Sequence, residues 1–172
     1  MDFLSVHIYD VPRPETNSQR RGSNAEAILD MIEQYSLLKL GEVKPLVISE
    51  YGACCGFWEG EYYAERDWLQ LQSIPSITMT LMDRPHKVLK AIPFIVDKAT
   101  WYLNNNPYQY PHVLLENRDG GSDWEYTHLA KYYQLWSNIK GERIDTWTDD
   151  PDLQLDAYVD GNKVYVLLVN LE

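Results

Sequence analysis

The stretch PLVISEYGACCG, residues 45–56, contains the strand that decides the fold. Apolar and β-branched residues lead into Ser49 and Glu50, and an aromatic residue and a glycine follow. The apolar run predicts a buried strand, and Gly52 indicates a turn directly after it. Because an ionised carboxylate is costly to desolvate unless it is paired or used, Glu50 has two interpretations. It is either a buried structural acid that caps the turn or a catalytic acid at the mouth of a pocket.

A second strand is predicted upstream, at residues 2–10. Its alternation places Leu4, Val6 and Ile8 on one face, and Phe3, Ser5, His7 and Tyr9 on the other. Between the two strands, residues 22–41 carry apolar side chains at helical spacing. The pair Ser23 and Glu26 fits a capping box, and Gly41 indicates the end of this helix.

Downstream of residue 56 the pattern continues with helices, a further strand and then a change of character. We expect helices at 61–74, 77–92 and 123–141, a third strand at 93–102, and strands within 143–150 and 153–172. The turn Asp160-Gly161-Asn162 joins the last two strands as a hairpin. Helix-length spacing between the first three strands predicts a parallel sheet, and we place a domain boundary near residue 142.

Three consecutive β-α units fit either a doubly wound sheet or part of a (β/α)8 barrel. The sequence lacks the GxGxxG and GxxxxGK[ST] motifs of nucleotide-binding proteins and the GxSxG motif of serine hydrolases. Both folds place the functional site at the carboxyl ends of the strands. Polar and aromatic residues are predicted at all three strand ends: His7, Tyr9 and Asp10, then Glu50 and Tyr51, then Thr100 and Trp101.

The composition excludes several classes of protein. The 172 residues carry 26 acidic and 15 basic side chains, a net charge of −11, which argues against nucleic acid as a partner. No apolar run is long enough to span a membrane, and no signal peptide is visible. The adjacent Cys54 and Cys55 are interpreted as thiols, and the four scattered histidines offer no metal-ligand spacing, so we expect no metal and no cofactor.

Aromatic residues gather in the predicted loops of this chain. The chain has thirteen tyrosines and six tryptophans. The loop positions are Trp58, Tyr62, Tyr63, Tyr102, Tyr108, Tyr110, Trp124 and Tyr126. Flat rings on loops are typical of sugar-binding clefts, where they stack on the C–H face of a pyranose. The alternative is that these rings anchor the loops.

Several longer stretches resemble glycoside hydrolase family 86, the clan A family of β-agarases and β-porphyranases. These stretches are DFLSVHIYD, ISEYG, MDRPHKVLKAIPFIVDKATWY and YYQLWSNIKGERIDTWTDDPDLQLDAYVDGNKVYV. The resemblance implies an α/β fold: about strands 6–8 of a (β/α)8 TIM barrel in residues 1–141, then the first strands of an antiparallel β-sandwich in 142–172. It also implies that the N-terminal half of the barrel lies outside this chain, and that the enzyme acts outside the cytoplasm, in the extracellular, cell-surface or periplasmic space.

The resemblance further implies retaining endo-hydrolysis of a red-algal galactan, agarose or porphyran. Two carboxyl groups about 5–5.5 Å apart perform that reaction, one as nucleophile and one as general acid/base. By its position in SEYG, Glu50 would be the nucleophile. The family's acid/base would precede this chain, so we expect the chain alone to be inactive. Nearby hydrogen-bond donors would keep Glu50 ionised, and His7 and Tyr9 are the candidates.

Further substrate contacts are expected at aromatic and basic side chains. Trp101 would form the floor under the sugar, and Trp58 and Tyr62 a further subsite wall. In a porphyranase, Arg13, Arg20 and Arg21 would clamp a sulfate ester, although a solvated loop is the simpler interpretation. The acidic segment 116–123 lacks the EF-hand spacing and is interpreted as a plain loop. Two alternatives stay open: a clan A hydrolase of another β-glycan, and a non-catalytic carbohydrate-binding fragment.

Overall fold

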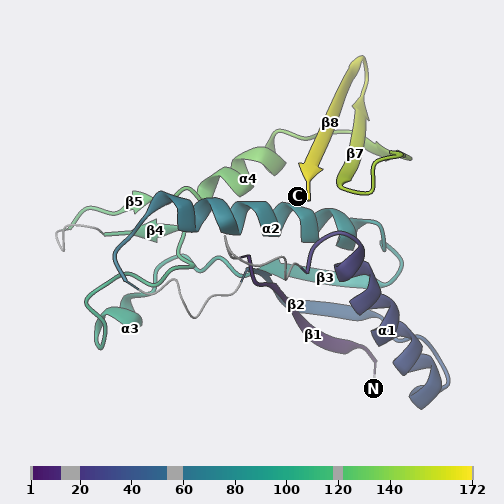
Figure 1. Cartoon of the computed structure of the whole chain (residues 1–172), viewed down its shortest axis with the longest axis horizontal. Coiled ribbons are helices and arrows are strands. Elements are labelled where there is room, and N and C mark those ends of the chain that lie inside the picture. The colour runs from purple at the N-terminus through teal and green to yellow at the C-terminus, as the bar shows by residue number, and fades with distance from the viewer. Residues whose placement is uncertain (1, 13–19, 54–59, 118–121, 172) are drawn as a thin grey trace.

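The structure of the chain is a computed structural model that describes residues 2–12, 20–53, 60–117 and 122–171. One three-stranded sheet is parallel, with its strands in the order β1 (Leu4–Asp10), β2 (Leu46–Ala53) and β3 (Val88–Pro93). Helix α1 (Ser23–Leu40) connects β1 to β2, and α2 (Ala64–Met82) connects β2 to β3 (Figure 1). The sequence therefore predicted the parallel sheet, the first two strands and the helix between them.

One face of this sheet is buried under α1 and α2. The core consists of alternate strand residues and facing helix residues: Ile8, Leu46, Ile48, Tyr51, Leu29, Ile74, Ile77, Leu81 and Tyr132. Burying one large aliphatic side chain is worth about 1.5–3 kcal/mol, so this cluster holds the helices on the sheet. The opposite face carries the side chains that the functional site uses.

The third strand lies earlier than the sequence predicted. Residues 88–93 form β3 rather than a helix, and the strand predicted at 93–102 is wrong. Pro93 pairs with Tyr51 as the last residue of β3. The Phe94 N–H then donates to the Tyr51 carbonyl at 2.8 Å, and the short helix α3 (Thr100–Leu103) follows.

Two helix signals in the sequence have another role in the structure. The N-cap of α1 is Gly22, and no side chain caps the helix, so the Ser23–Glu26 capping box is wrong. Helix α4 (Ala130–Ser137) is shorter than the predicted 123–141, because residues 125–126 form β5 and pair with β4 (Leu115–Glu116).

Gly141 follows α4 and lies against another part of the backbone. A Cβ at this position would lie 2.0 Å from the Val159 carbonyl oxygen, so the close approach of the two backbone segments requires a glycine.

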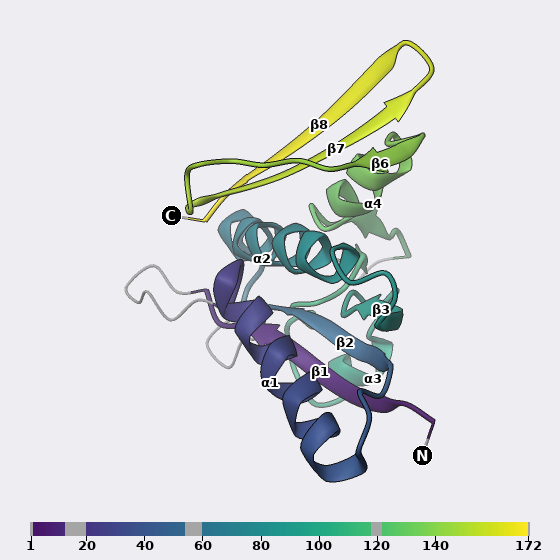
Figure 2. The same cartoon turned by 90° about the vertical axis from the view of Figure 1, so that its right-hand side faces the viewer.

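The C-terminal residues form a second, antiparallel sheet. It contains β6 (Glu142–Ile144), β7 (Leu153–Asp160) and β8 (Lys163–Asn170), with the predicted hairpin turn at Gly161 and Asn162. Helix α2 lies between this sheet and the parallel one, and β7 and β8 extend across the far side of α2 (Figure 1 and Figure 2). Met79 of α2 packs against Tyr158 and Leu167 in this second core.

Polar contacts also join α2 to the C-terminal sheet. The Arg143 guanidinium pairs with Asp83 and Asp156 and donates to the Met82 carbonyl at the end of α2. Asp83 and Asp156 hold the pKa of Arg143 above its usual value, against the effect of burial. In the middle of α2, Ser76 donates to the Gln154 amide oxygen. Within the described ranges, no helix has the length and apolar character that a membrane crossing requires.

Candidate functional site

Glu50 lies on the uncovered face of the parallel sheet with two side chains of the neighbouring strand. The Tyr9 hydroxyl donates to Glu50 Oε2 at 2.6 Å, and His7 Nδ1 lies 3.2 Å from the same oxygen. The Glu50 side chain is 36 % exposed, so solvent or a ligand can reach it. The sequence predicted this grouping, because His7 and Tyr9 share one face of β1.

A β-bulge in β2 aims Glu50 at this face. Val6 pairs with Ile48, but the next residue, His7, pairs with Glu50, so β2 has one extra residue at Ser49. The pairing with β3 shifts at the same place, between Ile48 and Tyr51. In a regular strand Glu50 would share the buried face with Ile48, since side chains alternate. The extra residue turns Glu50 to the open face and gives the core position to Tyr51.

A serine pair extends the open face next to Glu50. Ser5 Oγ and Ser49 Oγ share a hydrogen bond of 2.9 Å between β1 and β2. Ser49 is the additional residue of the bulge, so its hydroxyl stands on the same side as the Glu50 carboxylate. The sequence predicted Ser5 on this face but not Ser49, because no pattern in the sequence predicts the bulge.

Aromatic rings continue from Tyr9 along the end of the sheet. Phe94, directly after β3, contacts Tyr9 edge-to-face at a centroid distance of 5.8 Å and also contacts Tyr110. Tyr110 in turn lies 5.4 Å from the Trp101 ring. Trp101 is on α3 rather than at a strand end and is 60 % exposed. Phe94 therefore has the strand-end position that the sequence assigned to Trp101.

His112 is buried behind these rings. It packs against Phe94 and Tyr110, and its Nδ1 lies 2.7 Å from the Gln70 Oε1 oxygen. The Gln70 amide nitrogen donates to the Pro111 carbonyl, so Oε1 is the atom that faces His112, and Nδ1 carries the proton. Burial, and then the positive charge of Arg66, lowers the pKa of His112 to about 4. Sequence reasoning missed this histidine, which lies in a loop without periodicity.

Two of the predicted sulfate-binding arginines lie at the carboxyl end of β1. The exposed Arg20 donates its backbone N–H to Asp10 Oδ1 at 2.6 Å, and its Nη1 lies 3.5 Å from the Tyr9 carbonyl oxygen. Arg21 is only 5 % exposed, and its Nε lies 3.4 Å from Asp10 Oδ2. Arg21 is therefore inside the fold and not offered to a ligand. Arg13 falls outside the described residues.

Tyr62 belongs to a different pocket, of about 380 Å³. Its hydroxyl donates to the buried Asp67 at 3.1 Å, and burial raises the pKa of that carboxyl. Six further residues line the pocket with it: Glu61, Pro107, Tyr108, Gln109, Glu116 and Asn117. Trp58, the other predicted wall residue, is outside the described residues. Within the described part of the chain, no group of three or more His, Cys, Asp or Glu side chains could hold a metal ion.

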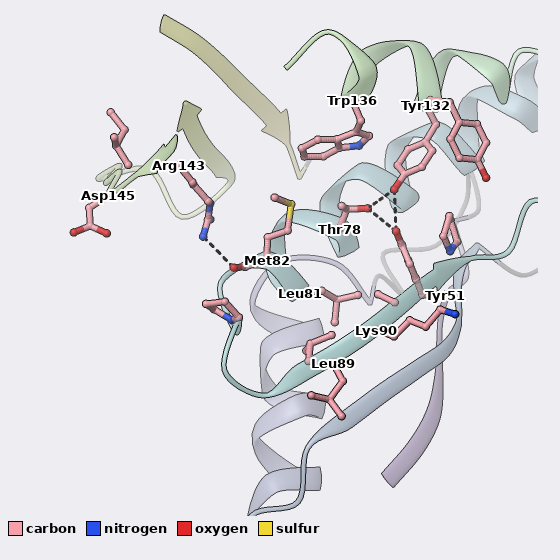
Figure 3. Close-up of a pocket in the computed structure, with 16 residues that line it drawn as sticks. Tyr51, Thr78, Leu81, Met82, Leu89, Lys90, Tyr132, Trp136, Arg143 and Asp145 are labelled. Atoms are coloured by element: carbon pink, nitrogen blue, oxygen red, sulfur yellow. Dashed lines mark hydrogen bonds between the residues drawn. The ribbon is translucent and has the colours of Figure 1, made fainter. Parts of the chain in front are cut away.

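A larger pocket, of about 890 Å³, opens on the buried side of β2 rather than at Glu50 (Figure 3). The Tyr51 and Tyr132 hydroxyls meet there at 2.9 Å, and both contact Thr78. Burial raises the pKa of Tyr51, which stays a neutral donor. The exposed Leu89 of β3 lines the same pocket. Apolar and aromatic side chains form most of this pocket, and Asp145 is the carboxylate that lines it.

The Glu50 site combines a half-exposed carboxylate, a donor hydroxyl and an imidazole with a nearby row of aromatic rings. A carboxylate held by such donors can act as a nucleophile or as a base. The rings supply flat apolar surface beside it. The set lies at the carboxyl ends of parallel strands, where this class of fold binds its ligands.

Comparisons with known proteins identify relatives of the whole chain. No protein-family model matches it. The chain is 46% identical over 179 residues to a funoran endo-beta-hydrolase of Wenyingzhuangia aestuarii and 42% identical over 178 residues to a beta-agarase of Pseudoalteromonas atlantica. It is 37% identical over 180 residues to beta-porphyranase A of Phocaeicola plebeius. These alignments cover 99–100% of this chain but only 24%, 34% and 25% of the relatives, so the chain spans about a quarter to a third of their length.

Solved structures agree with the sequence relatives. The crystal structure of BuGH86 in complex with neoagarooctaose matches with a TM-score of 0.91 and 41% identity, over 100% of this chain and 29% of that one. BpGH86A, a beta-porphyranase of glycoside hydrolase family 86 from the gut bacterium Bacteroides plebeius, matches with a TM-score of 0.84 and 37% identity, over 99% of this chain and 30% of that one. The chain is therefore homologous, over its full length, to a segment of the enzymes of glycoside hydrolase family 86.

Proposed function

We propose that this chain is the part of a retaining endo-galactan hydrolase that carries the nucleophile, Glu50. The observation that supports this most directly is the bulge that turns Glu50 to the open face, where Tyr9 and His7 contact its Oε2. A structural acid that only capped a turn would have no need of a strand irregularity to expose it. The named relatives act on agarose, porphyran or funoran, so a red-algal galactan is the proposed substrate class.

In the proposed reaction, a Glu50 carboxylate oxygen attacks the anomeric carbon while the glycosidic bond breaks. A second carboxylic acid gives its proton to the leaving oxygen, and later removes one from the water that releases the sugar. Tyr9 holds Oε2 by its hydrogen bond, which leaves Oε1 as the attacking atom. We assign the second carboxyl to a part of the polypeptide outside these 172 residues, so the chain alone would be inactive.

The fold proposed for the complete catalytic domain is a (β/α)8 barrel. The parallel order β1-β2-β3, with both helices on one face and the polar side chains on the other, supports it. So do the two edge strands, each of which has exposed apolar side chains close by: Leu38 of α1 near β1, and Leu89 of β3. Strands elsewhere in the polypeptide would pair with these edges.

A β-sandwich is the proposed fold for the region that begins at β6. Strands β7 and β8 present apolar residues on both faces, and only one face packs on α2. The other face carries the exposed residues Val164, Val166 and Leu168. An antiparallel sheet with two apolar faces fits between two layers, so a second sheet would cover this face.

Substrate contacts are proposed at Trp101 and Arg20. Trp101 is exposed and connects to Tyr9 through the rings of Tyr110 and Phe94, so it would stack on a sugar one or more units from the cleavage point. Arg20 is the exposed basic side chain beside the Tyr9 carbonyl and would pair with a sulfate ester where the galactan carries one. Since polymeric galactans are met outside the cell, we propose an extracellular, cell-surface or periplasmic location.

The decisive experiment compares Glu50→Gln with the unchanged enzyme in the longest polypeptide that carries this chain. Neoagaro- and porphyran-derived oligosaccharides are the substrates, and release of reducing ends is measured. We expect kcat to fall on the order of 10⁴-fold, while calorimetric binding of the oligosaccharide is retained. The exposed Glu125→Gln is the control and should keep full activity.

Chemical rescue separates a nucleophile from an acid/base in the same polypeptide. In Glu50→Ala, azide would occupy the vacated space and attack the anomeric carbon, giving a glycosyl azide of inverted configuration. Recovery of activity with that product supports the assignment. Full activity of Glu50→Gln would refute it, and binding without any hydrolysis in the unchanged polypeptide would favour a carbohydrate-binding role.

A further inference from the structure

A buried ion pair closes the carboxyl end of β1. Asp10, the last residue of the strand, is fully buried and accepts hydrogen bonds from the Arg20 N–H and from Ser73 Oγ of α2, both at 2.6 Å. Arg21 Nε lies 3.4 Å from the same carboxylate. The residue before Asp10 is Tyr9, which donates to Glu50. Tyr9 and Asp10 are consecutive residues, so the contacts that fix the backbone at Asp10 also constrain the position of the Tyr9 hydroxyl.

Arg21 also contacts the far end of the chain. Its Nη2 donates to the carbonyl of Leu171 at 3.3 Å, and the Leu171 N–H donates to the Asp152 carbonyl at 2.8 Å. Next to Arg21, a Cβ on Gly22 would lie 2.5 Å from Leu171 Cδ1, and Gly22 has a φ of +49°. The residue after β8 is therefore seated closely against the start of α1.

The two contacts of residue 21 require the geometry of an arginine side chain. One guanidinium presents donors in two directions, so it reaches the Asp10 carboxylate and the Leu171 carbonyl at once. Burial lowers the pKa of Arg21, and the charge of Asp10 opposes that effect. A partner removed from such a pair leaves a buried charge without compensation. A lysine would keep the charge but not the two-directional contact.

We propose that Arg21 is a positioning residue, through which docking of the sheet β6–β8 fixes the end of β1 and holds the Tyr9 hydroxyl on Glu50. The inference rests on the proposed function of Glu50. It gives the C-terminal sheet a role in the reaction, because Leu171 acts on the site through Arg21, Asp10 and Tyr9. A displacement of about 1 Å at a reacting group is enough to lower a rate about 100-fold.

The test uses Arg21→Met in the longest polypeptide that carries this chain, with Arg84→Met as its matched control. Arg84 is a partly buried arginine with two acidic partners, Asp30 and Glu33, and it joins α1 to the turn after α2. We expect both variants to lower the melting temperature. Only Arg21→Met should lower kcat, by about 10- to 100-fold with KM nearly unchanged, and Arg21→Lys should recover only part of the loss.

A second pair of variants covers the case in which Arg21→Met does not fold. Gly22→Ala pushes against Leu171 and strains the positive-φ backbone next to Arg21, so it should lower kcat in the same way. The added Leu171→Ala removes the clash but not the strain, so it should restore kcat only in part. Amide exchange supplies a measurement that does not depend on activity. In Arg21→Met or Gly22→Ala, the amides of residues 4–10 and of Arg20 should exchange faster, whereas Arg84→Met should leave them unchanged.

The outcomes separate this inference from the proposed function. If the unchanged polypeptide cleaves no galactan oligosaccharide, the proposed function fails. In that case, amide exchange in β1 of Arg21→Met and Gly22→Ala still decides whether Arg21 fixes the strand. If Arg21→Met or Gly22→Ala folds with unaltered kcat and unaltered exchange in β1, Arg21 is a stabilising residue only and the inference is overturned.

Discussion

At the scale of single residues, His112 shows how the interior supports the site. It is neutral because burial and Arg66 lower its pKa to about 4, and it supports the ring of Phe94, which contacts Tyr9. An unfolded chain has a histidine pKa near 6.5, so between about pH 6.5 and 4 the unfolded state binds the additional proton. Stability is therefore fully present above pH 6.5 and is lost as the pH falls toward 4.

We predict that this single group contributes up to about 3 kcal/mol to the fall in the free energy of unfolding across that range. Thermal or urea denaturation of the unchanged polypeptide and of His112→Gln, measured from pH 4 to 7, checks the prediction. The variant should be less stable at pH 7 and should lose less stability on acidification. Parallel curves for the two proteins would show that His112 does not titrate as proposed.

The sequence was informative for residues of regular strands and less so for loops. Alternation in β1 was sufficient to group His7 with Tyr9, and the apolar run before Glu50 placed that residue at the end of β2. His112 and Phe94 carry no such signal, because their positions depend on contacts distant in the sequence. Arg21 was misinterpreted for the same reason: its partner Leu171 lies 150 positions away.

At the scale of elements, the bulge in β2 determines which face receives the carboxylate. Deleting Ser49 would restore regular alternation, put Glu50 on the core face beside Ile48, and expose Tyr51. A buried, unpaired carboxylate costs several kcal/mol, so we predict that the deletion abolishes activity and the cooperative melting transition together. Ser49→Ala keeps the extra residue and should retain the fold. Circular dichroism melting curves of both variants check this.

Element boundaries show where pattern reasoning stops. The sequence predicted a helix up to residue 92 and a strand from Pro93, whereas the strand ends at Pro93. Short apolar runs lie on both sides of the proline, and runs of that length do not distinguish a helix from a strand. In the sequence, Gly141 marks only the end of the helix predicted at 123–141. It is required by the Val159 carbonyl of another strand, a contact that only the folded chain creates.

A deletion of Ser49 that kept both fold and activity would refute the role given to the bulge in β2.

At the scale of the whole molecule, α2 is the central layer and apolar surface is exposed around it. Leu38 is 81 % exposed on α1, and Val166 and Leu168 are exposed on the outer face of β8. Exposed apolar patches and unpaired strand edges favour association. This exposure fits the resemblance to a larger enzyme, whose further elements would cover these surfaces.

We predict that the 172 residues produced alone associate and melt without a sharp, reversible transition. Leu38→Lys and Val166→Lys should each lower the mean mass seen by light scattering during size-exclusion chromatography, whereas Ala27→Lys, an exposed site on the same helix as Leu38, should not. In the longest polypeptide that carries the chain, the same two substitutions should instead lower the melting temperature, because further strands and helices would cover both sites. A monomeric isolated chain with a cooperative melt would contradict the proposed barrel and would mean that these surfaces need no cover.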